Sequence, residues 1–397
     1  MTSSQWDDAA REVLTSLHHA HLHRSRRVIT PVDPVHVDWN GRRLVNFASN
    51  NYLGLTHHPR VVEAVEQAAR EFGAGSGAAP IMTGYTPTHG FAEQRIAQWK
   101  GSQTSVLLPS GYQANHAAVQ AFAAVAEKGS RPIRFLLDKL CHASLIDAVR
   151  GTQKPFRVFP HNGLQKLQRL LDEADENEIQ VVVSESIFSM DGDAADLAGL
   201  AKLKESHPFV LMLDEAHGTG AYGPGGSGLA AELGLRSAVD VTVLTLSKSI
   251  GCGGGAVCGS TAFCESLVNL ARAYIYSTSV PPMIAAAATA AIDVMEREPE
   301  RQQRVRRLAS RVRADLRSAG LDLPLGDSPI IPILLGSESA ALQAADELAD
   351  QGMLSLAVRP PTVPRGTSRL RVTLSSQHSD EEVQQLTHAL RRLRDST

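Results

Sequence analysis

The sequence is poor in cysteine and lacks both a long hydrophobic run and an excess of one charge. Its four cysteines, Cys141, Cys252, Cys258 and Cys264, include no C-x-x-C pair, so neither a zinc knuckle nor a dithiol redox site is indicated. We expect reduced thiols and no metal site. The most apolar stretch, residues 284–292, is far shorter than the about 20 residues that a bilayer requires, so we expect no membrane partner.

The balance of charge also limits the possible partners. Lys plus Arg (39) nearly equals Asp plus Glu (42), so no global field would hold a nucleic acid or an anionic membrane, and a small-molecule partner is expected. The first eight residues are polar and acidic, without the basic start and apolar core of a secretion signal, which predicts a cytoplasmic protein. We interpret the tract with His18, His19, His21 and His23 as solvated side chains rather than a metal site.

The pattern of apolar residues predicts an α/β fold. A length of 397 residues suggests roughly two or three domains. Residues 60–72 repeat apolar positions at helical spacing, and beyond them short apolar runs alternate with helical patterns, which predicts a mainly parallel sheet with helices on both faces. The predicted strands are 135–137, 158–159, 179–183, 210–213 and 239–246.

A change in composition suggests where the domains meet. Residues 296–318 are strongly charged, which predicts a solvated connecting helix before a smaller α/β unit. In that unit we expect strand 330–335, helix 339–351, strands 354–358 and 370–374, and helix 380–393. The predicted organisation is an N-terminal segment 1–58, a large ligand-binding domain 59–295 and a small C-terminal domain 296–397.

Polar side chains stand where the predicted parallel strands end. Asp138, Glu185, Asp214 and the pair Ser247-Lys248 each follow an apolar run. Ligands of such sheets bind beyond the carboxyl ends of the strands. The sequence therefore predicts that these four strand ends converge on one crevice.

Asp214 follows a buried strand directly, and His217 comes three residues later. A carboxylate placed there can keep a pyridine nitrogen protonated, which makes the ring the electron sink that pyridoxal phosphate chemistry needs. His217 could then hydrogen-bond the phenolic oxygen of the cofactor. Two other interpretations stay open: residues 214–217 also spell the DEAH box of helicases, and Asp214 could merely cap a turn. The helicase interpretation requires an upstream G-x-x-x-x-G-K-[ST] segment, which the sequence lacks.

Lys248 ends another predicted buried strand and is followed by several glycines. Partial burial favours the neutral amine, which is the form that adds to an aldehyde, whereas an exposed structural lysine is the alternative. The loop 110–115 precedes an Ala-rich helix whose N-terminal N–H groups and dipole would seat a phosphate. Gly111 and Tyr112 lie in this loop, although Tyr112 could instead be a core residue.

Two further segments carry candidate binding residues. His142 comes just after the strand that ends at Asp138, and it could stack on a pyridine ring and hydrogen-bond the substrate, or merely begin a helix. Residues 359–371 present arginines along a strand, an arrangement suited to bidentate capture of a carboxylate.

These motifs resemble those of the α-oxoamine synthases, pyridoxal phosphate (PLP) enzymes of the aspartate-aminotransferase-like type I fold. The likeness spans nearly the whole chain. It is carried by residues 49–55, 189–193, 214–218, 276–282 and 359–371, of which Arg359-Pro-Pro-Thr-Val-Pro364 is the most discriminating string. The fold that the resemblance implies has a large domain with a mainly parallel seven-stranded sheet and a smaller C-terminal α/β domain.

The resemblance also implies a role for each motif. Lys248 would hold the cofactor as a Schiff base, Asp214 would pair with the ring nitrogen, and His142 would stack on the ring. Further cofactor contacts would come from Gly111, Tyr112, Ser189, His217 and Thr245. Ser277 and Thr278 would reach the phosphate of the neighbouring subunit, which implies a homodimer with shared active sites. Substrate contacts would come from Arg24, Asn50, Thr362 and Arg371, the last of these holding the amino-acid carboxylate.

The implied reaction is a decarboxylative condensation of an amino acid with an acyl thioester, with L-alanine and pimeloyl thioester as the expected substrates. Sister synthases that use glycine or serine with acetyl-, succinyl- or fatty acyl-thioesters are the nearest alternative. A non-catalytic PLP-binding regulator on the same fold is a more distant one. Two places depart from the family pattern: residues 75–80 are less rich in glycine and serine, and Ser247 stands where glycine is common.

Overall fold

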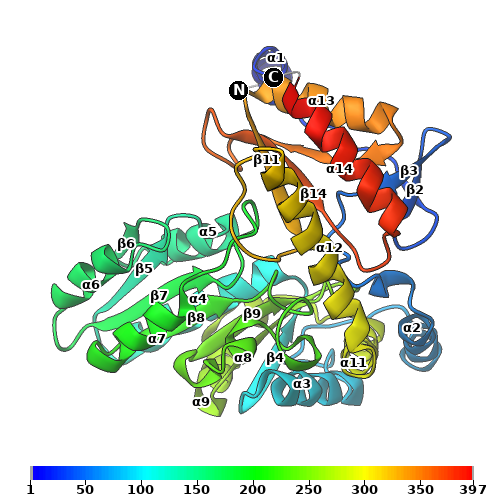
Figure 1. The fold of residues 1–397 in the computed structure, drawn as a ribbon. Coiled ribbons are helices and arrows are strands. Elements are labelled where there is room, and N and C mark those ends of the chain that lie inside the picture. The colour runs from blue at the N-terminus through cyan, green and yellow to red at the C-terminus, as the bar shows by residue number, and fades with distance from the viewer. Residues whose placement is uncertain (1–2, 396–397) are drawn as a thin grey trace. The chain divides into compact units, whose positions relative to one another are not determined.

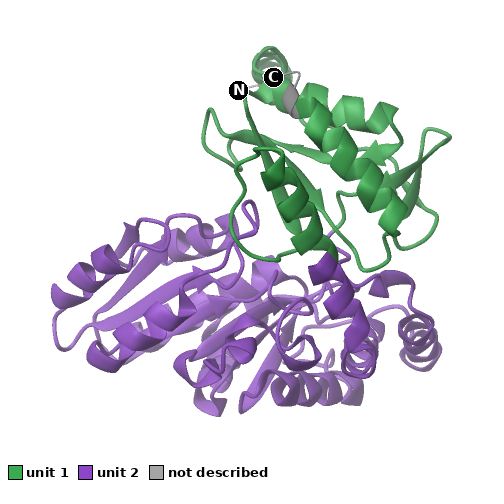
Figure 2. Cartoon of the chain, in the orientation of Figure 1, with its two compact units in different colours: residues 1–49, 308–397 green, residues 50–307 purple. Residues whose placement is uncertain are grey.

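The N-terminal and C-terminal segments of the chain fold together. In this computed structural model, which describes residues 3–395, the chain divides into a small unit, residues 1–49 and 308–397, and a large unit, residues 50–307 (Figure 2). Strand β3 (Arg42–Asn46) pairs in parallel with β12 (Met353–Leu354), with Val45 opposite Met353. This pairing draws the N-terminal segment into the unit of the C-terminal residues, so the division lies at 49/50 and 307/308 rather than where the composition changes.

The large unit is built on a seven-stranded sheet with helices on both faces (Figure 1). The strand order is β4-β10-β9-β8-β7-β5-β6, in which β5 to β9 pair in parallel and β10 is antiparallel to both of its neighbours. The strands are β4 (Thr104–Leu108), β5 (Ile133–Asp138), β6 (Phe156–Phe159), β7 (Ile179–Glu185), β8 (Val210–Asp214), β9 (Val241–Thr245) and β10 (Gly255–Gly259). The predicted mainly parallel seven-stranded sheet is confirmed.

Two apolar layers hold this sheet between its helices. Along β7, Val181 and Val183 belong to one buried cluster and Val182 to the other, because successive side chains of a strand point to opposite faces. The helices are α2 (Pro59–Phe72), α3 (Pro87–Lys100), α4 (Gly111–Lys128), α5 (Ala143–Gly151), α6 (Leu164–Asp172), α7 (Leu197–Ser206), α8 (Leu229–Glu232), α9 (Thr261–Leu270), α10 (Arg272–Ile275) and α11 (Pro282–Arg297). None of the helices within residues 3–395 is long and apolar enough to cross a membrane.

The small unit contains two smaller sheets. One has the order β1 (Thr30–Pro31), β2 (His36–Trp39), β3 and β12, and the other has the order β11 (Ile330–Gly336), β14 (Ser368–Thr373) and β13 (Leu356–Val358). The single strand expected over 354–358 is therefore two strands, because the chain leaves one sheet after Leu354 and enters the other at Leu356. The helices are α1 (Ser3–His19), α13 (Glu338–Asp350), α14 (Asp380–Asp395) and the part of α12 (Pro299–Ser318) from residue 308 on, since α12 begins in the large unit.

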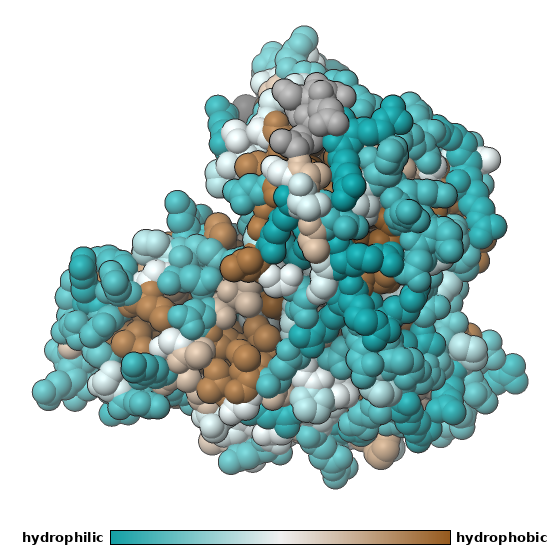
Figure 3. All heavy atoms as spheres, viewed as in Figure 1, coloured by the Kyte–Doolittle hydropathy of each residue, from teal (hydrophilic) through white to brown (hydrophobic). Residues whose placement is uncertain are grey.

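Helix α12 is rich in arginine, and Figure 3 shows a mostly hydrophilic surface along α12 and α14. However, Leu308, Val312 and Leu316 are buried, and so is Arg313, which is 1% exposed. Arg313 donates to the carbonyl oxygens of Pro324, at 2.8 Å, and Ile330. The segment expected to be a solvated helix is thus amphipathic, and one of its arginines satisfies buried backbone acceptors.

Strand β10 lies close to the beginning of α4. A Cβ placed on Gly255 would lie 2.8 Å from the backbone N and Cα of Gly111 and from the carbonyl carbon of Ser110, which is closer than side chains approach. The neighbouring Gly254 forms a β-bridge with Ser110. Glycine at 255 therefore permits this close approach of two backbone segments.

We expect Gly255→Ala to lower the free energy of unfolding by about 1–3 kcal/mol, because the added methyl group forces a backbone shift at the start of α4. Urea unfolding measures this change. Gly253→Ala is a matched control, since a Cβ there would meet only Ile284 Cδ1 at 3.9 Å, and we expect a change within about 0.5 kcal/mol. An equal loss in both variants would contradict the proposed close approach.

Candidate active site

A cavity of about 240 Å³ lies at the carboxyl ends of the central strands, wholly within the large unit. It is lined by Ser110, Gly111, Tyr112, Asn115, His142, Ser144, Glu185, Asp214, Ala216, His217, Val243, Leu244, Thr245, Ser247 and Lys248. The predicted cofactor residues among them are Gly111, Tyr112, His142, Asp214, His217, Thr245 and Lys248. Residues distant in sequence thus meet at the edge of the sheet where ligands of α/β folds bind.

Lys248 stands in the turn after β9 and is half-buried, so it is not the exposed structural lysine of the alternative interpretation. Its Nζ lies 2.9 Å from Nε2 of His217, and Nδ1 of His217 lies 2.6 Å from the hydroxyl of Tyr52. Tyr52 also donates to Oδ1 of Asn50 at 3.2 Å. A chain of hydrogen bonds therefore runs from the amine through an imidazole and a phenol to a predicted substrate residue.

Asp214 is the last residue of β8 and is 5% exposed. Its Oδ1 accepts from the backbone N–H of Ala216, and its Oδ2 accepts from Nδ2 of Asn115, both at 2.8 Å. Asp214 therefore caps the turn that follows β8, as one alternative supposed, and also faces the cavity. Two neutral donors hold the carboxylate in a fixed orientation.

Asn115 was missed by sequence reasoning. It lies in α4 and is 2% exposed, and its Nδ2 also donates to Oγ of Ser144 at 2.9 Å. Its buried Oδ1 has no hydrogen-bond partner among the described residues. A polar amide inside an otherwise Ala-rich helix was the available signal, because such a group is buried only where it finds a partner.

Glu185 is the in-register neighbour of Asp214 on the parallel strand β7. It is 2% exposed, and its Oε1 accepts from the backbone N–H of His142 at 2.5 Å. Burial, and then the negative charge of Asp214, raises the pKa of Glu185 well above its ordinary value. The surroundings of Glu185 therefore favour its protonated form.

His142 is the N-cap of α5, so it begins a helix as well as lining the cavity. Its Nδ1 accepts from the backbone N–H of Ser144 at 3.2 Å and lies 2.8 Å from Oγ of the same residue. Desolvation lowers the pKa of His142, although Asp214 opposes this effect. The ring is therefore a neutral imidazole whose Nδ1 serves as an acceptor.

The N-terminus of α4 opens on the cavity. Ser110 caps the helix by accepting from the backbone N–H of Gln113 at 3.1 Å, and the first helical residues leave N–H groups without helical acceptors. A Cβ on Gly111 would lie 2.9 Å from Cβ of Thr245, so glycine keeps this end of the cavity open. Tyr112 is 49% exposed, so the alternative of a core residue is wrong. This N-terminus suits an anion such as a phosphate.

Several predicted residues lie outside the cavity lining. Ser189 is buried in the turn after β7, and Ser277 and Thr278 follow α10. Arg24, Thr362 and Arg371 belong to the small unit. Their roles stay predictions.

Asp138, the fourth strand end, does not line the cavity, so the prediction of four converging ends is wrong for this residue. Its carboxylate instead accepts from the backbone N–H groups of Leu140 and Asn162, at 2.8 and 2.9 Å, and contacts His161. The physical reason is the strand order: β5 lies beside the edge strand β6, and the side chain turns toward the loop that follows β6.

Comparison with known proteins adds to this geometry. Residues 42–390 match the family aminotransferase class I and II. The chain is 42% identical over 361 residues to an 8-amino-7-oxononanoate synthase of Anaeromyxobacter dehalogenans, which covers 90% of this chain and 89% of that protein. A solved lysine-to-alanine variant of the serine palmitoyltransferase from S. paucimobilis, with a bound PLP–myriocin aldimine, has a TM-score of 0.92 at 26% identity and covers 100% of this chain and 99% of its own.

A second solved structure is the 8-amino-7-oxononanoate synthase of Francisella tularensis. It has a TM-score of 0.76 at 26% identity and covers 89% of this chain and 98% of its own. Both neighbours confirm the type I fold that the sequence predicted.

The raised pKa of Glu185 predicts how the stability of the protein depends on pH. An acid whose pKa is raised by folding binds its proton more tightly in the folded state, so it costs stability as the pH rises above its unfolded value of about 4.5. Glu185→Gln removes this cost. The free energy of unfolding of the variant, minus that of the wild type, should therefore increase from pH 5 to pH 8. Urea unfolding at the two pH values measures the difference.

Glu185→Ala is the control for the hydrogen bond to His142. It leaves a buried N–H group without its acceptor, and we expect it to be less stable than Glu185→Gln by about 1–3 kcal/mol at both pH values, since neither variant carries the titrating carboxyl. A Gln variant whose stability follows that of the wild type across this pH range would show that Glu185 is ionised.

Proposed function

The chain belongs to the aminotransferase class I and II family, and from this premise we propose that it is an 8-amino-7-oxononanoate synthase, a PLP-dependent acyltransferase of biotin biosynthesis. It joins L-alanine to a pimeloyl thioester and releases carbon dioxide and the free thiol. The observation that carries this function is the meeting of Lys248 and Asp214 in one cavity. The similarity to synthases of that name, over 90% and 93% of this chain for two of them, favours these substrates over those of the sister enzymes.

The residues of the cavity fit PLP. When bound, PLP stores the negative charge that develops at Cα of the amino-acid substrate. Asp214 would hold the protonated ring nitrogen, Lys248 the aldehyde carbon, and the N-terminal N–H groups of α4 the phosphate. The neutral ring of His142 is suited to stacking on an aromatic ring, since it carries no charge that needs solvation.

Lys248 also serves as the general base. Its freed amine removes the Cα proton of the amino acid and becomes an ammonium that donates to Nε2 of His217. Nδ1 of His217 then carries the hydrogen and donates to the oxygen of Tyr52, whose own O–H donates to Asn50. These hydrogen bonds are all donated in the same direction, and together they hold the amine in place.

The substrate contacts form a second part of the proposal. Arg24 donates to the carbonyl oxygen of Pro360 at 2.9 Å, and Arg359 donates to those of His21 and His23, so residues 21–24 and the segment with Thr362 are held together. Arg371 is 5% exposed on β14, where Nη1 lies 3.3 Å from Oγ1 of Thr373. A guanidinium held in this way is suited to bidentate binding of the amino-acid carboxylate.

We further propose a homodimer with shared active sites, in which Ser277 and Thr278 reach the phosphate of the partner. Large apolar side chains are exposed around this segment, as an interface requires: Ile81, Met82, Tyr85, Phe91 and Tyr276. The loop 76–80 is tied to the segment by Ser76, which donates to the carbonyl oxygen of Val280 at 2.5 Å, and by the N–H of Ser279, which donates to that of Ala78 at 3.0 Å. We place the enzyme in the cytoplasm, where its free thiols stay reduced.

A screen of thiol release tests the reaction. We expect turnover of L-alanine with pimeloyl-coenzyme A, because the chain resembles the synthases that carry this activity. Lys248→Ala should lose at least about 10³-fold in kcat/KM and the absorption band of the lysine-bound cofactor. Lys154→Ala, which removes a lysine paired with Glu127 on the surface, is the matched control and should keep both.

The same screen separates the rival functions. Turnover of glycine or serine with acetyl-, succinyl- or palmitoyl-coenzyme A, without turnover of L-alanine and the pimeloyl donor, would refute the substrate assignment. Binding of PLP without thiol release from any pair would indicate a regulator.

Mixed dimers test the shared active site. Lys248→Ala alone and the double variant Ser277→Ala, Thr278→Ala alone should each have little activity. Co-expressed chains should regain activity, because one site of each mixed dimer then combines an intact lysine with an intact phosphate pair. Absence of recovery, with mixed dimers present by mass, would show that each subunit builds its own site.

A further inference from the structure

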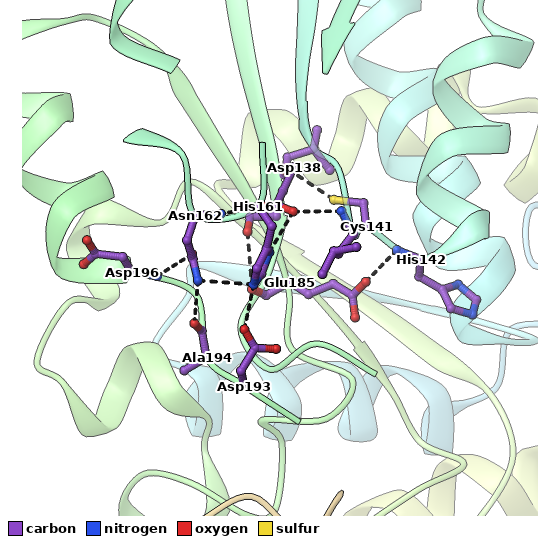
Figure 4. A network of polar contacts seen from close by, with 12 residues as sticks. Asp138, Cys141, His142, His161, Asn162, Glu185, Asp193, Ala194 and Asp196 are labelled. Carbon is purple, nitrogen blue, oxygen red and sulfur yellow. Dashed lines mark hydrogen bonds and ion pairs between the residues drawn. The ribbon is translucent and has the colours of Figure 1, made fainter. Parts of the chain in front are cut away.

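A histidine joins two loops beside the cavity without lining it. His161 follows the edge strand β6, and its Nδ1 lies 3.0 Å from Oδ1 of Asp138 while its Nε2 lies 2.6 Å from Oδ2 of Asp193 (Figure 4). Asp138 ends β5, and Asp193 lies in the turn between β7 and α7. The network therefore spans the ends of three neighbouring strands, in the order β7, β5, β6.

The ring of His161 is an imidazolium. Both nitrogens face carboxylate oxygens, which can only accept, so both nitrogens must carry hydrogen. Burial by itself would lower the pKa of His161, but the hydrogen bonds and charges of Asp138 and Asp193 raise it to about 10. The rings of His161 and Phe188 also form an edge-to-face pair, with the centroids 4.4 Å apart and the rings at 87°. The cation is therefore fixed in position as well as in charge.

One end of this network holds the turn that leads to His142. Asp138 accepts from the backbone N–H of Leu140 at 2.8 Å and from that of Asn162 at 2.9 Å, in addition to His161. The backbone N–H of His142 is itself bound by Glu185 from the side of β7. The turn is thus held from both sides, and among these contacts the one with His161 adds a compensating positive charge.

The other end holds the turn that carries Ser189. Within it, the N–H of Phe188 donates to the carbonyl oxygen of Asp193 at 2.9 Å, and that of Gly192 donates to the carbonyl oxygen of Phe188 at 2.8 Å. Oδ1 of Asp193 is buried without a hydrogen-bond partner among the described residues. Its carboxylate therefore depends on His161 for compensation of its lost hydration.

Asn162 strengthens the same connection. Its Nδ2 donates to the carbonyl oxygen of Ala194 at 3.0 Å, and its Oδ1 accepts from the backbone N–H of Asp196 at 3.0 Å (Figure 4). The loop after β6 thus contacts the turn after β7 through two consecutive residues, His161 and Asn162.

We propose that His161 is a positioning residue whose imidazolium ties the turn carrying His142 to the turn carrying Ser189 and so shapes the cofactor site. Because β6 is the edge strand, no further strand within residues 3–395 supports these turns from that side, and the loop after β6 supports them instead. The inference rests on the proposed function only for the cofactor that His142 and Ser189 contact.

His161→Gln tests the role, because glutamine keeps hydrogen-bonding capacity but not the charge. We expect the Kd for PLP to rise on the order of 10- to 100-fold, as loss of hydrogen bonds to charged groups implies. In the PLP-free protein, amide hydrogen exchange should accelerate in residues 138–142 and 186–195. The matched control is His207→Gln, which removes a histidine paired with the single carboxylate of Asp172 at 2.9 Å, and it should change neither quantity.

A second variant distinguishes the loss of one contact from a general failure of folding. Asp193→Ala leaves the contact between His161 and Asp138, so exchange should accelerate in residues 186–195 and not in 138–142. In the double variant His161→Gln, Asp193→Ala, the Kd for PLP should be no higher than in His161→Gln alone, because both substitutions break the same connection.

Wild-type affinity for PLP in His161→Gln would overturn the inference, as would exchange that accelerates uniformly over the chain. If the wild-type protein bound no PLP, the proposed function would fail, whereas the exchange of the two turns would still support or refute the role of His161.

Discussion

A buried carboxylate organises the active site. Asp214 ends a strand in the middle of the sheet, where water is scarce, and a buried charge is costly unless it is paired and hydrogen-bonded. The residues around Asp214 provide this stabilisation. Asn115 and the backbone of Ala216 supply neutral donors, and the raised pKa of Glu185 disfavours a second negative charge beside Asp214. When PLP is bound, its protonated ring nitrogen would supply the remaining compensation.

Two consecutive acids at the end of β8, Asp214 and Glu215, contact different parts of the large unit. Asp214 faces the cavity. Glu215 instead accepts hydrogen bonds from Nζ of the buried Lys100, at 2.8 Å, and from the backbone N–H of Ala230, at 3.0 Å. Lys100 also donates to Thr219 at 2.8 Å, which ties the segment after β8 to α3. Removal of either partner of such a buried pair is costly, so this ion pair holds in place the backbone from which Asp214 and His217 project. Asp214 thus belongs to the active site, whereas the adjacent Glu215 anchors the backbone.

Sequence reasoning succeeded where a local pattern determines the structure and failed where strand order does. The runs in β7 and β8 were recognisable because strands buried on both faces are continuously apolar. Strands β4 and β10 escaped notice, since Thr104 and the glycines at both ends of β10 interrupt the apolar pattern. Asp138 was assigned to the crevice because a sequence does not reveal that β5 neighbours the edge strand. Asn115 and Tyr52 were missed for the same reason, since their partners come from distant segments.

The central claim is that Lys248 is the residue that bears the cofactor opposite Asp214. The most direct measurement is reduction of the PLP-loaded protein with borohydride, followed by proteolysis and mass spectrometry of the labelled peptide. The account predicts a single phosphopyridoxyl group, attached to Nζ of Lys248. A label on any other lysine, or a wild-type protein that retains no label, would contradict it.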